Sequence, residues 1–143
     1  MSRLIIGAAA FLACCAHAPE AAPAPKQRQP TAEEKAWFDG LKNAIGPEWI
    51  ARTEKAVEAH DPEGCRDFAV ERHLVVEFVV NADGVFTRAR VRESSGLPYI
   101  DQLGPATFTA VHRVSPPPRS LVGKKLPFAF NVNARPNPYS CAR

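Results

Sequence analysis

Side chains that could carry out chemistry are spread along this chain without the spacings that catalysis needs. Ser94-Ser95-Gly96 lacks the flanking glycines that place a nucleophilic serine on a sharp turn between a strand and a helix. The histidines at positions 60, 73 and 112 have no nucleophile or acid at a spacing typical of a catalytic pair. The sequence also has no glycine-rich phosphate loop. His60 lies near Cys65, but no C-x-x-C motif or paired-histidine spacing accompanies them. We therefore expect no catalytic residues, no cofactor and no metal site.

Four cysteines carry the remaining reactive chemistry, and they fall into two pairs. Cys14 and Cys15 belong to an apolar N-terminal run, whereas Cys65 and Cys141 lie in the body of the chain. In an oxidising compartment, two cysteines that span nearly the whole body favour a disulfide bridge. A closed loop of roughly 75 residues would contribute about 4 kcal/mol on the chain-entropy account, less any strain. The alternative is two free thiols.

The charge of the chain is small and scattered. The net charge is +3, and 45% of the residues are hydrophobic, which is enough for a core and too many for a disordered chain. Lysine and arginine occur singly or in short pairs such as Lys124-Lys125, without the interleaved aromatic residues of a nucleic-acid-binding stripe. The composition therefore predicts one small domain and excludes nucleic acid as its partner.

Residues 1–18 are predicted to be a signal peptide. Met1-Ser2-Arg3 is a short basic start, and Leu4–Cys15 is an apolar run without charge. A run of about a dozen residues fits a signal peptide better than a membrane-spanning helix, which needs roughly 20. Residues 19–30 follow as a linker rich in alanine and proline, which would span about 40 Å at roughly 3.1 Å per residue as polyproline II.

Two routes of processing are open for this signal peptide. Phe11-Leu12-Ala13-Cys14 has the small residue that precedes the cysteine of a lipobox, and the overlapping Leu12–Cys15 has the leucine of that motif. Ordinary signal peptidase would instead cleave after Ala16-His17-Ala18, where Pro19 disfavours cleavage. We favour lipidation at one of the two cysteines, which would hold the protein at a bacterial membrane. A short uncleaved anchor is the third alternative.

A helical segment is predicted over residues 31–64. Thr31, with Glu34 three residues later, forms the pattern of a capping box, and apolar residues then recur at helical spacing. Gly46-Pro47 interrupts that spacing. We therefore expect two short helices, Ala32–Ile45 and Pro47–Ala59, with the proline in the first turn of the second.

Residues 65–143 predict an α+β domain with a small antiparallel three-stranded sheet and one packed helix. A strand over Leu74–Val80, a turn over Asn81–Gly84 and an alternating strand over Val85–Glu93 form a hairpin. A helix follows within Ile100–Arg113. Three prolines then precede a closing strand over Lys125–Asn133 with alternate apolar residues on one face.

The order and spacing of these motifs resemble the TonB C-terminal domain family, which includes the related C-terminal domain of TolA. The resemblance covers roughly residues 74–133 and, more loosely, the helical segment with its spaced tryptophans. The motifs that carry it are Asp83-Gly84, Ser94-Ser95-Gly96, Ile100-Asp101, Ala110-Val111 and Leu126-Pro127-Phe128-Ala129-Phe130. Here the stretch before Ala110-Val111 is a few residues longer than usual. We expect the helix to start late, with Pro105 in its first turn.

The resemblance implies a non-catalytic, periplasmic protein-binding module. In TonB the edge of the sheet accepts an extended segment of an outer-membrane receptor as an added strand, because an exposed edge offers unpaired backbone groups. The closing strand is the expected edge here, since Pro127 near its start suits an edge position. The expected contact segment is Phe128, Ala129, Phe130, Asn131 and Val132.

The partner implied is an envelope protein, such as a peptide of an outer-membrane receptor, and pairing of two such edges would give a homodimer. Arg88, Arg90 and Arg92 are expected to form a solvated strand face. The alternative function is a genuine TonB-type energy transducer with an uncleaved N-terminal anchor. TonB has a transmembrane anchor and a long spacer, so we expect the fold to carry over without the energy transduction.

We expect mass spectrometry of the mature chain from membrane fractions to find a lipidated cysteine at its N-terminus. The double variant Cys14→Ala, Cys15→Ala should lose the lipid and leave the membrane fraction, because neither lipobox frame then has its acceptor thiol. An intact Met1 in the inner membrane would contradict this prediction and would favour energy transduction.

Overall fold

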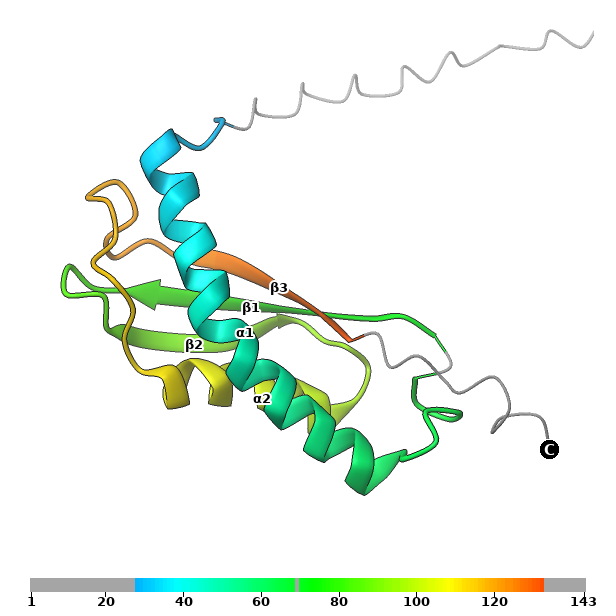
Figure 1. Ribbon diagram of the computed structural model, residues 1–143. Helices are drawn as coiled ribbons and strands as arrows, with labels where there is room; N and C mark the ends of the chain where they lie inside the picture. The colour runs from blue at the N-terminus through cyan, green and yellow to red at the C-terminus, as the bar shows by residue number, and fades with distance from the viewer. Residues whose placement is uncertain (1–27, 69, 133–143) are drawn as a thin grey trace, which may run out of the picture.

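Two helices and a three-stranded antiparallel sheet make up residues 28–68 and 70–132, which the computed structural model describes. The strands are β1 (Arg72–Val80), β2 (Phe86–Glu93) and β3 (Leu126–Val132), in the order β2-β1-β3. Helix α1 (Ala32–His60) precedes them in the chain, and α2 (Pro98–Val111) connects β2 to β3 (Figure 1). The predicted α+β class and its antiparallel sheet are confirmed. The predicted signal peptide and Cys141 lie outside the described residues.

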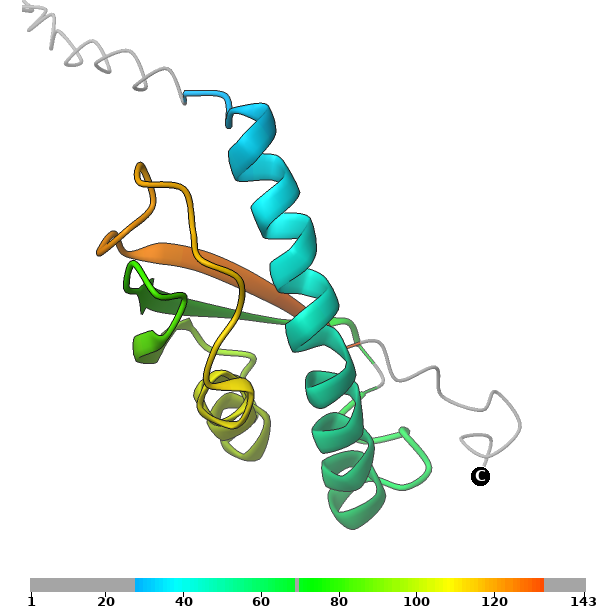
Figure 2. The same cartoon turned by 60° about the vertical axis from the view of Figure 1, so that its left-hand side comes forward.

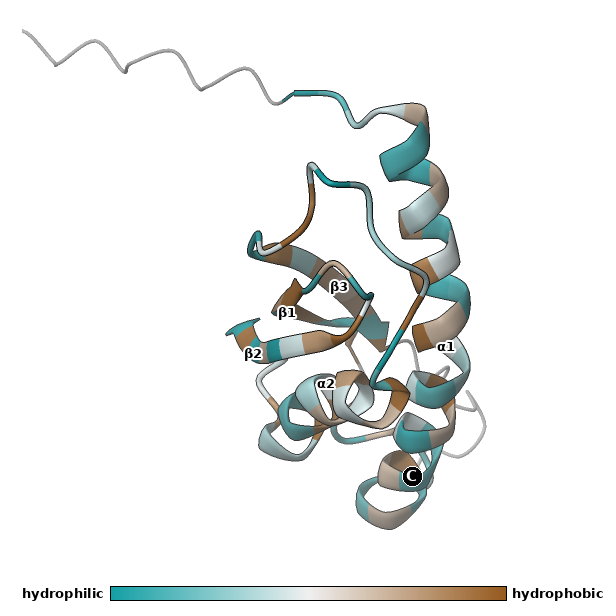
Figure 3. Ribbon diagram, turned by 90° about the vertical axis from the view of Figure 1, so that its left-hand side faces the viewer, coloured by the Kyte–Doolittle hydropathy of each residue, from teal (hydrophilic) through white to brown (hydrophobic). Residues whose placement is uncertain are grey.

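One face of the sheet is buried beneath both helices. Along β1, residues 74, 76, 78 and 80 are fully buried and alternate with more exposed side chains, as expected for an antiparallel sheet with one wet face. The ring of Phe78 contacts Trp37 of α1 and Phe108 of α2, so the two helices share this face. Figure 2 shows the helices side by side, and Figure 3 shows hydrophobic segments of the helices and strands gathered around the space between them.

Helix α1 is one continuous helix of 29 residues, so the predicted division into two short helices is wrong. Pro47 lies inside it and removes one backbone hydrogen bond, which costs about 3 kcal/mol or more in a helix interior. Four buried side chains at four-residue spacing lie on both sides of this proline: Trp37, Leu41, Ile45 and Trp49. Because burying each contributes roughly 1.5–3 kcal/mol, packing on the sheet outweighs the break.

Helix α2 begins at Pro98 and contains Pro105 in its interior, so the predicted late start is also wrong. The carboxylate of Asp101 in the first turn accepts hydrogen bonds from the backbone N–H of Ser95 at 2.8 Å and from its hydroxyl at 2.7 Å. These bonds join the end of β2 to the start of the helix. The Ser94-Ser95-Gly96 motif is therefore a structural clamp for α2.

Gly104 allows α2 to lie directly on β1. A Cβ atom at this position would lie 2.6 Å from Cγ2 of Val76 and 2.8 Å from Cδ2 of Leu74, both closer than real Cβ contacts. The glycine therefore allows the helix to approach the sheet closely. Pro105 follows it inside the helix.

Glu34 ties the start of α1 to the loop before β3. The predicted capping box is present: Glu34 accepts the backbone N–H of Thr31 at 2.9 Å, and the Thr31 hydroxyl accepts the N–H of Glu34 at 3.2 Å. The buried carboxylate also accepts the hydroxyl of Ser120 at 2.6 Å and pairs with Arg28. The hydrogen bond from Ser120 and then that from Thr31 lower the pKa of Glu34 from its ordinary 4.5 to about 2.

The substitution Glu34→Gln should lower the melting temperature at pH 7 by several degrees, because it removes the charge that these donors stabilise. A depressed pKa in the folded state contributes stability above pH 4.5 that is lost as the pH falls towards 2. The gap between wild type and variant should therefore narrow over that range in thermal unfolding followed by circular dichroism. Glu33→Gln, an exposed neighbour in the same turn, is the control. A gap of constant size down to pH 2.5 would contradict the prediction.

Candidate functional site

The sheet has two edges, and the start of the β2 edge is covered. The N–H of Phe86 donates to the carbonyl of His112 at 3.1 Å, and the N–H of Val114 donates to the carbonyl of Gly84 at 3.0 Å. Val85 also forms an isolated bridge with Arg113. The pairing of β2 with β1 contains two register irregularities, which bend a strand and blunt an edge. The β2 edge is therefore poorly suited to pairing with another chain.

The β3 edge is regular and open in the part of the chain that the structure describes. β3 pairs with β1 from Leu126 to Val132 without a register shift, and none of the described strands lies beyond it. The contact segment expected from the sequence falls on this strand. Phe130 and Val132 are buried, Phe128 is half-buried, and Ala129 and Asn131 are exposed. The aromatic side chains thus belong to the core, and the backbone forms the edge.

Backbone groups alternate between the two sides of a strand, so residues 127, 129 and 131 present theirs to the same side of β3. Proline within a sheet is confined to positions whose missing N–H faces away from a neighbouring strand. The side of β3 on which Pro127 would carry its N–H is therefore the side away from β1. Ala129 and Asn131 present their N–H and C=O groups on this free side. The side-chain amide of Asn131 is held by the ring of His73, whose Nδ1 lies 2.9 Å from its Oδ1.

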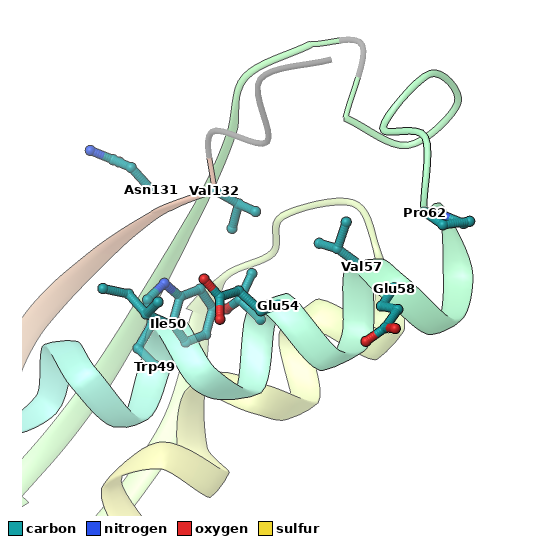
Figure 4. A pocket seen from close by; sticks show the side chains of 9 residues that line it. Trp49, Ile50, Glu54, Val57, Glu58, Pro62, Asn131 and Val132 are labelled. Atoms are coloured by element: carbon teal, nitrogen blue, oxygen red, sulfur yellow. The ribbon is translucent and has the colours of Figure 1, made fainter. Parts of the chain in front are cut away.

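A groove of about 470 Å³ lies beside the end of this edge, between α1 and β3. Its floor is mainly apolar and includes Trp49, Ile50, Thr53 and Val57 of α1 together with Asn131 and Val132 of β3. Figure 4 shows Ile50, Glu54 and Val57 on the side of the helix that faces Val132. Ile50 is 56% exposed, and Val70 is the other exposed large apolar side chain among the described residues.

Two carboxylates, Glu54 and Glu58, stand at the rim of the groove, and both residues are exposed. They lie four residues apart, which makes them neighbours on the helix surface. Neither forms an ion pair with any residue in the described ranges, whereas Glu48 pairs with Arg52 at 2.6 Å on the same helix. The groove is thus apolar at its floor and negative at its rim.

A cluster at the end of α1 fixes the far end of this groove. The carboxylate of Asp61 accepts backbone N–H groups of Arg66 and Asp67 at 3.1 and 2.7 Å. Burial opposes ionisation of Asp61, but these hydrogen bonds outweigh it and lower its pKa. The hydroxyl of Tyr99 in α2 donates to Asp67 at 2.7 Å, while its ring stacks on His60 at 4.1 Å between centroids. Burial and the bond to Asp67 raise the pKa of Tyr99, so its hydroxyl keeps its proton and donates it in this hydrogen bond.

The other predicted site residues are only partly placed. Cys65 lies in the loop after α1, and the pairing of Arg72 with Val132 brings the end of β3 to the same end of the sheet. Cys14, Cys15 and Cys141 lie outside the described residues, so the lipidation and the disulfide stay predictions. Within the described ranges, no group of three or more His, Cys, Asp or Glu side chains is placed to hold a metal ion, and no helix is long and apolar enough to cross a membrane.

Sequence reasoning missed the groove because it ended the first helix at Ile45. A continuous helix places Ile50, Thr53, Glu54 and Val57 along one side, next to β3. Their spacing of three and four residues was the available signal, but it points to β3 only once α1 is known to pass Pro47 unbroken.

Comparison with known proteins places the fold. No protein-family profile and no curated protein matches the sequence. Among solved structures, the chain is similar to TolA domain III, in a solution structure bound to a peptide derived from the N-terminus of TolB. The TM-score is 0.52 at 18% identity, over 75% of this chain and 81% of that one. A match to the C-terminal domain of TonB from Helicobacter pylori has a TM-score of 0.40 at 18% identity, over 59% of this chain and 92% of that one.

The described residues thus form a small α+β domain in which two helices cover one face of a three-stranded antiparallel sheet. More particularly, it shares the fold of TolA domain III. The resemblance to the TolA C-terminal domain that the sequence predicted is confirmed at the level of the fold.

A bridge between Cys65 and Cys141 should raise the free energy of unfolding by up to about 4 kcal/mol through its effect on the unfolded chain. We expect Cys65→Ser, Cys141→Ser and the double variant to be destabilised equally in urea unfolding, and a reductant to destabilise only the wild type. Two thiols that react with iodoacetamide in the unreduced, unfolded mature chain would contradict the bridge.

Proposed function

We propose that this chain is a periplasmic binding module, held at a membrane by a lipid anchor, whose β3 edge accepts an extended segment of another envelope protein. The observation that carries the proposal is the regular β3 edge, open among the described strands, beside an apolar groove. The TolA domain III structure with its TolB peptide supports it, because that domain of the same fold binds a peptide. The role requires positioned backbone groups and no catalytic residue.

The expected affinity follows from the hydrogen bonds that the edge can make. Ala129 and Asn131 supply four backbone groups on the free side, and each new bond contributes a net of roughly 0.5–1.5 kcal/mol. Their sum, about 2–6 kcal/mol, brackets the roughly 4 kcal/mol that corresponds to a millimolar dissociation constant. Backbone pairing alone therefore gives weak binding, and side-chain contacts in the groove must supply the rest.

A blocked twelve-residue peptide of alternating threonine and valine should bind as an added strand to the isotope-labelled mature chain. The amide resonances of residues 128–132 should shift, and those of β2 should stay in place, because the β2 edge is covered at its start. Two methylated versions of the peptide, one with a methyl group on the backbone nitrogen of every threonine and one on that of every valine, should then behave differently. The version whose methyl groups face β3 should not bind, and the version whose methyl groups face away should still bind. Equal binding of the two versions, or shifts confined to β2, would contradict strand addition.

A further inference from the structure

Strand addition at β3 leaves open which segments are accepted. Backbone hydrogen bonds form with almost any extended sequence, so the choice of partner depends on the side chains that the added strand places against the domain. Side chains of a strand alternate between two faces, and those on the helix side of an added strand follow the direction of Phe130 and Val132. At the end of β3 that direction leads to the groove beneath α1.

The length of the groove sets how many side chains it can receive. From Ile50 to Glu58 the helix rises about 12 Å, at roughly 1.5 Å per residue. Side chains on one face of a strand repeat about every 6.6 Å, so two consecutive inward side chains fit along this distance. Ile50 and Val57 make the floor suitable for an apolar side chain, and the rim places carboxylates beside it.

The two rim carboxylates distinguish this part of α1 from the rest of the helix. Like charges four residues apart on a helix surface repel each other, and neither Glu54 nor Glu58 has an ion-pair partner among the described residues. The nearest cation in sequence, Lys55, lines a different hollow with Ala51 and Arg52. Asp39 and Glu48, by contrast, pair with cations four residues away. A cationic side chain in the groove would relieve this repulsion.

We propose that the groove selects a basic partner segment, in which a lysine or arginine lies two residues from an apolar side chain. This inference rests on the proposed strand addition and gives its specificity. Glu54 and Glu58 set this preference, because they are the charged residues among those that line the groove. An anionic membrane surface would be repelled by the same carboxylates.

The test uses the alternating threonine–valine peptide with the valine nearest its centre replaced by lysine in one version and by glutamate in another. Titration of the mature chain, followed by amide resonances, should show the lysine peptide binding about five- to tenfold more tightly at low salt. The preference should collapse in 0.5 M NaCl, where charges on exposed groups are screened. In Glu54→Gln, Glu58→Gln the two peptides should bind within about twofold of each other.

The matched control is Glu33→Gln, Glu93→Gln, which removes the same charge from exposed residues away from the groove and should keep the preference. If all peptides shift the β3 amides with equal affinity, charge selection is overturned and strand addition stands. If no peptide binds the wild type, both proposals fail. Tighter binding of the glutamate peptide, or an unchanged preference in the rim variant, would also overturn the selection of a basic segment.

Discussion

Trp49 of α1 stacks on Phe130 of β3 with ring centroids 4.1 Å apart, and Phe108 of α2 meets the same phenylalanine edge-on at 6.1 Å. An edge strand has a neighbour on one side only, so its attachment depends on what covers its buried face. Here one aromatic ring carries contacts from both helices. Such pairs contribute about 0.5–1.5 kcal/mol beyond the burial of their area. The position of β3, its free edge and the groove beside it all depend on this packing.

The groove is held in shape from both ends of α1. At the start of the helix, Glu34 is bound to Ser120, which links the helix to the loop that leads into β3. At its end, Asp61 collects backbone N–H groups of the following loop, and Tyr99 attaches that loop to α2. These attachments stabilise a long helix that Pro47 weakens near its middle. A groove with fixed walls loses little conformational entropy on binding, which favours selective recognition of a weakly paired strand.

The free edge and the groove have complementary roles in the proposed function. The edge supplies hydrogen bonds that any extended chain can meet, and an open edge also invites unwanted pairing. The groove adds an apolar floor and a negative rim at one end of that edge. In this proposal, affinity from the backbone and discrimination from the side chains are separated in space, so changes in Glu54 or Glu58 would alter the choice of partner and leave β3 unchanged. Because the start of the β2 edge is covered, the proposal assigns strand addition to the β3 edge.

Local patterns in the sequence were sufficient for the strands, the capping box and the fold class. Alternation along residues 74–80 and 126–132 reports burial on one face, and Thr31 with Glu34 reports a helix start, because both depend on neighbours within a few residues. The course of α1 past Pro47 and the early start of α2 were decided only by the tertiary structure. The course of α1 depends on burying Trp49 against Phe130. The early start of α2 depends on the hydrogen bond between Asp101 and Ser95, and on the close approach of Gly104 to Val76. The groove forms only when α1 and β3 are both in place. Trp49 and Phe130 lie about 80 positions apart in the chain, and their contact outweighs the local preference of Pro47 to interrupt a helix.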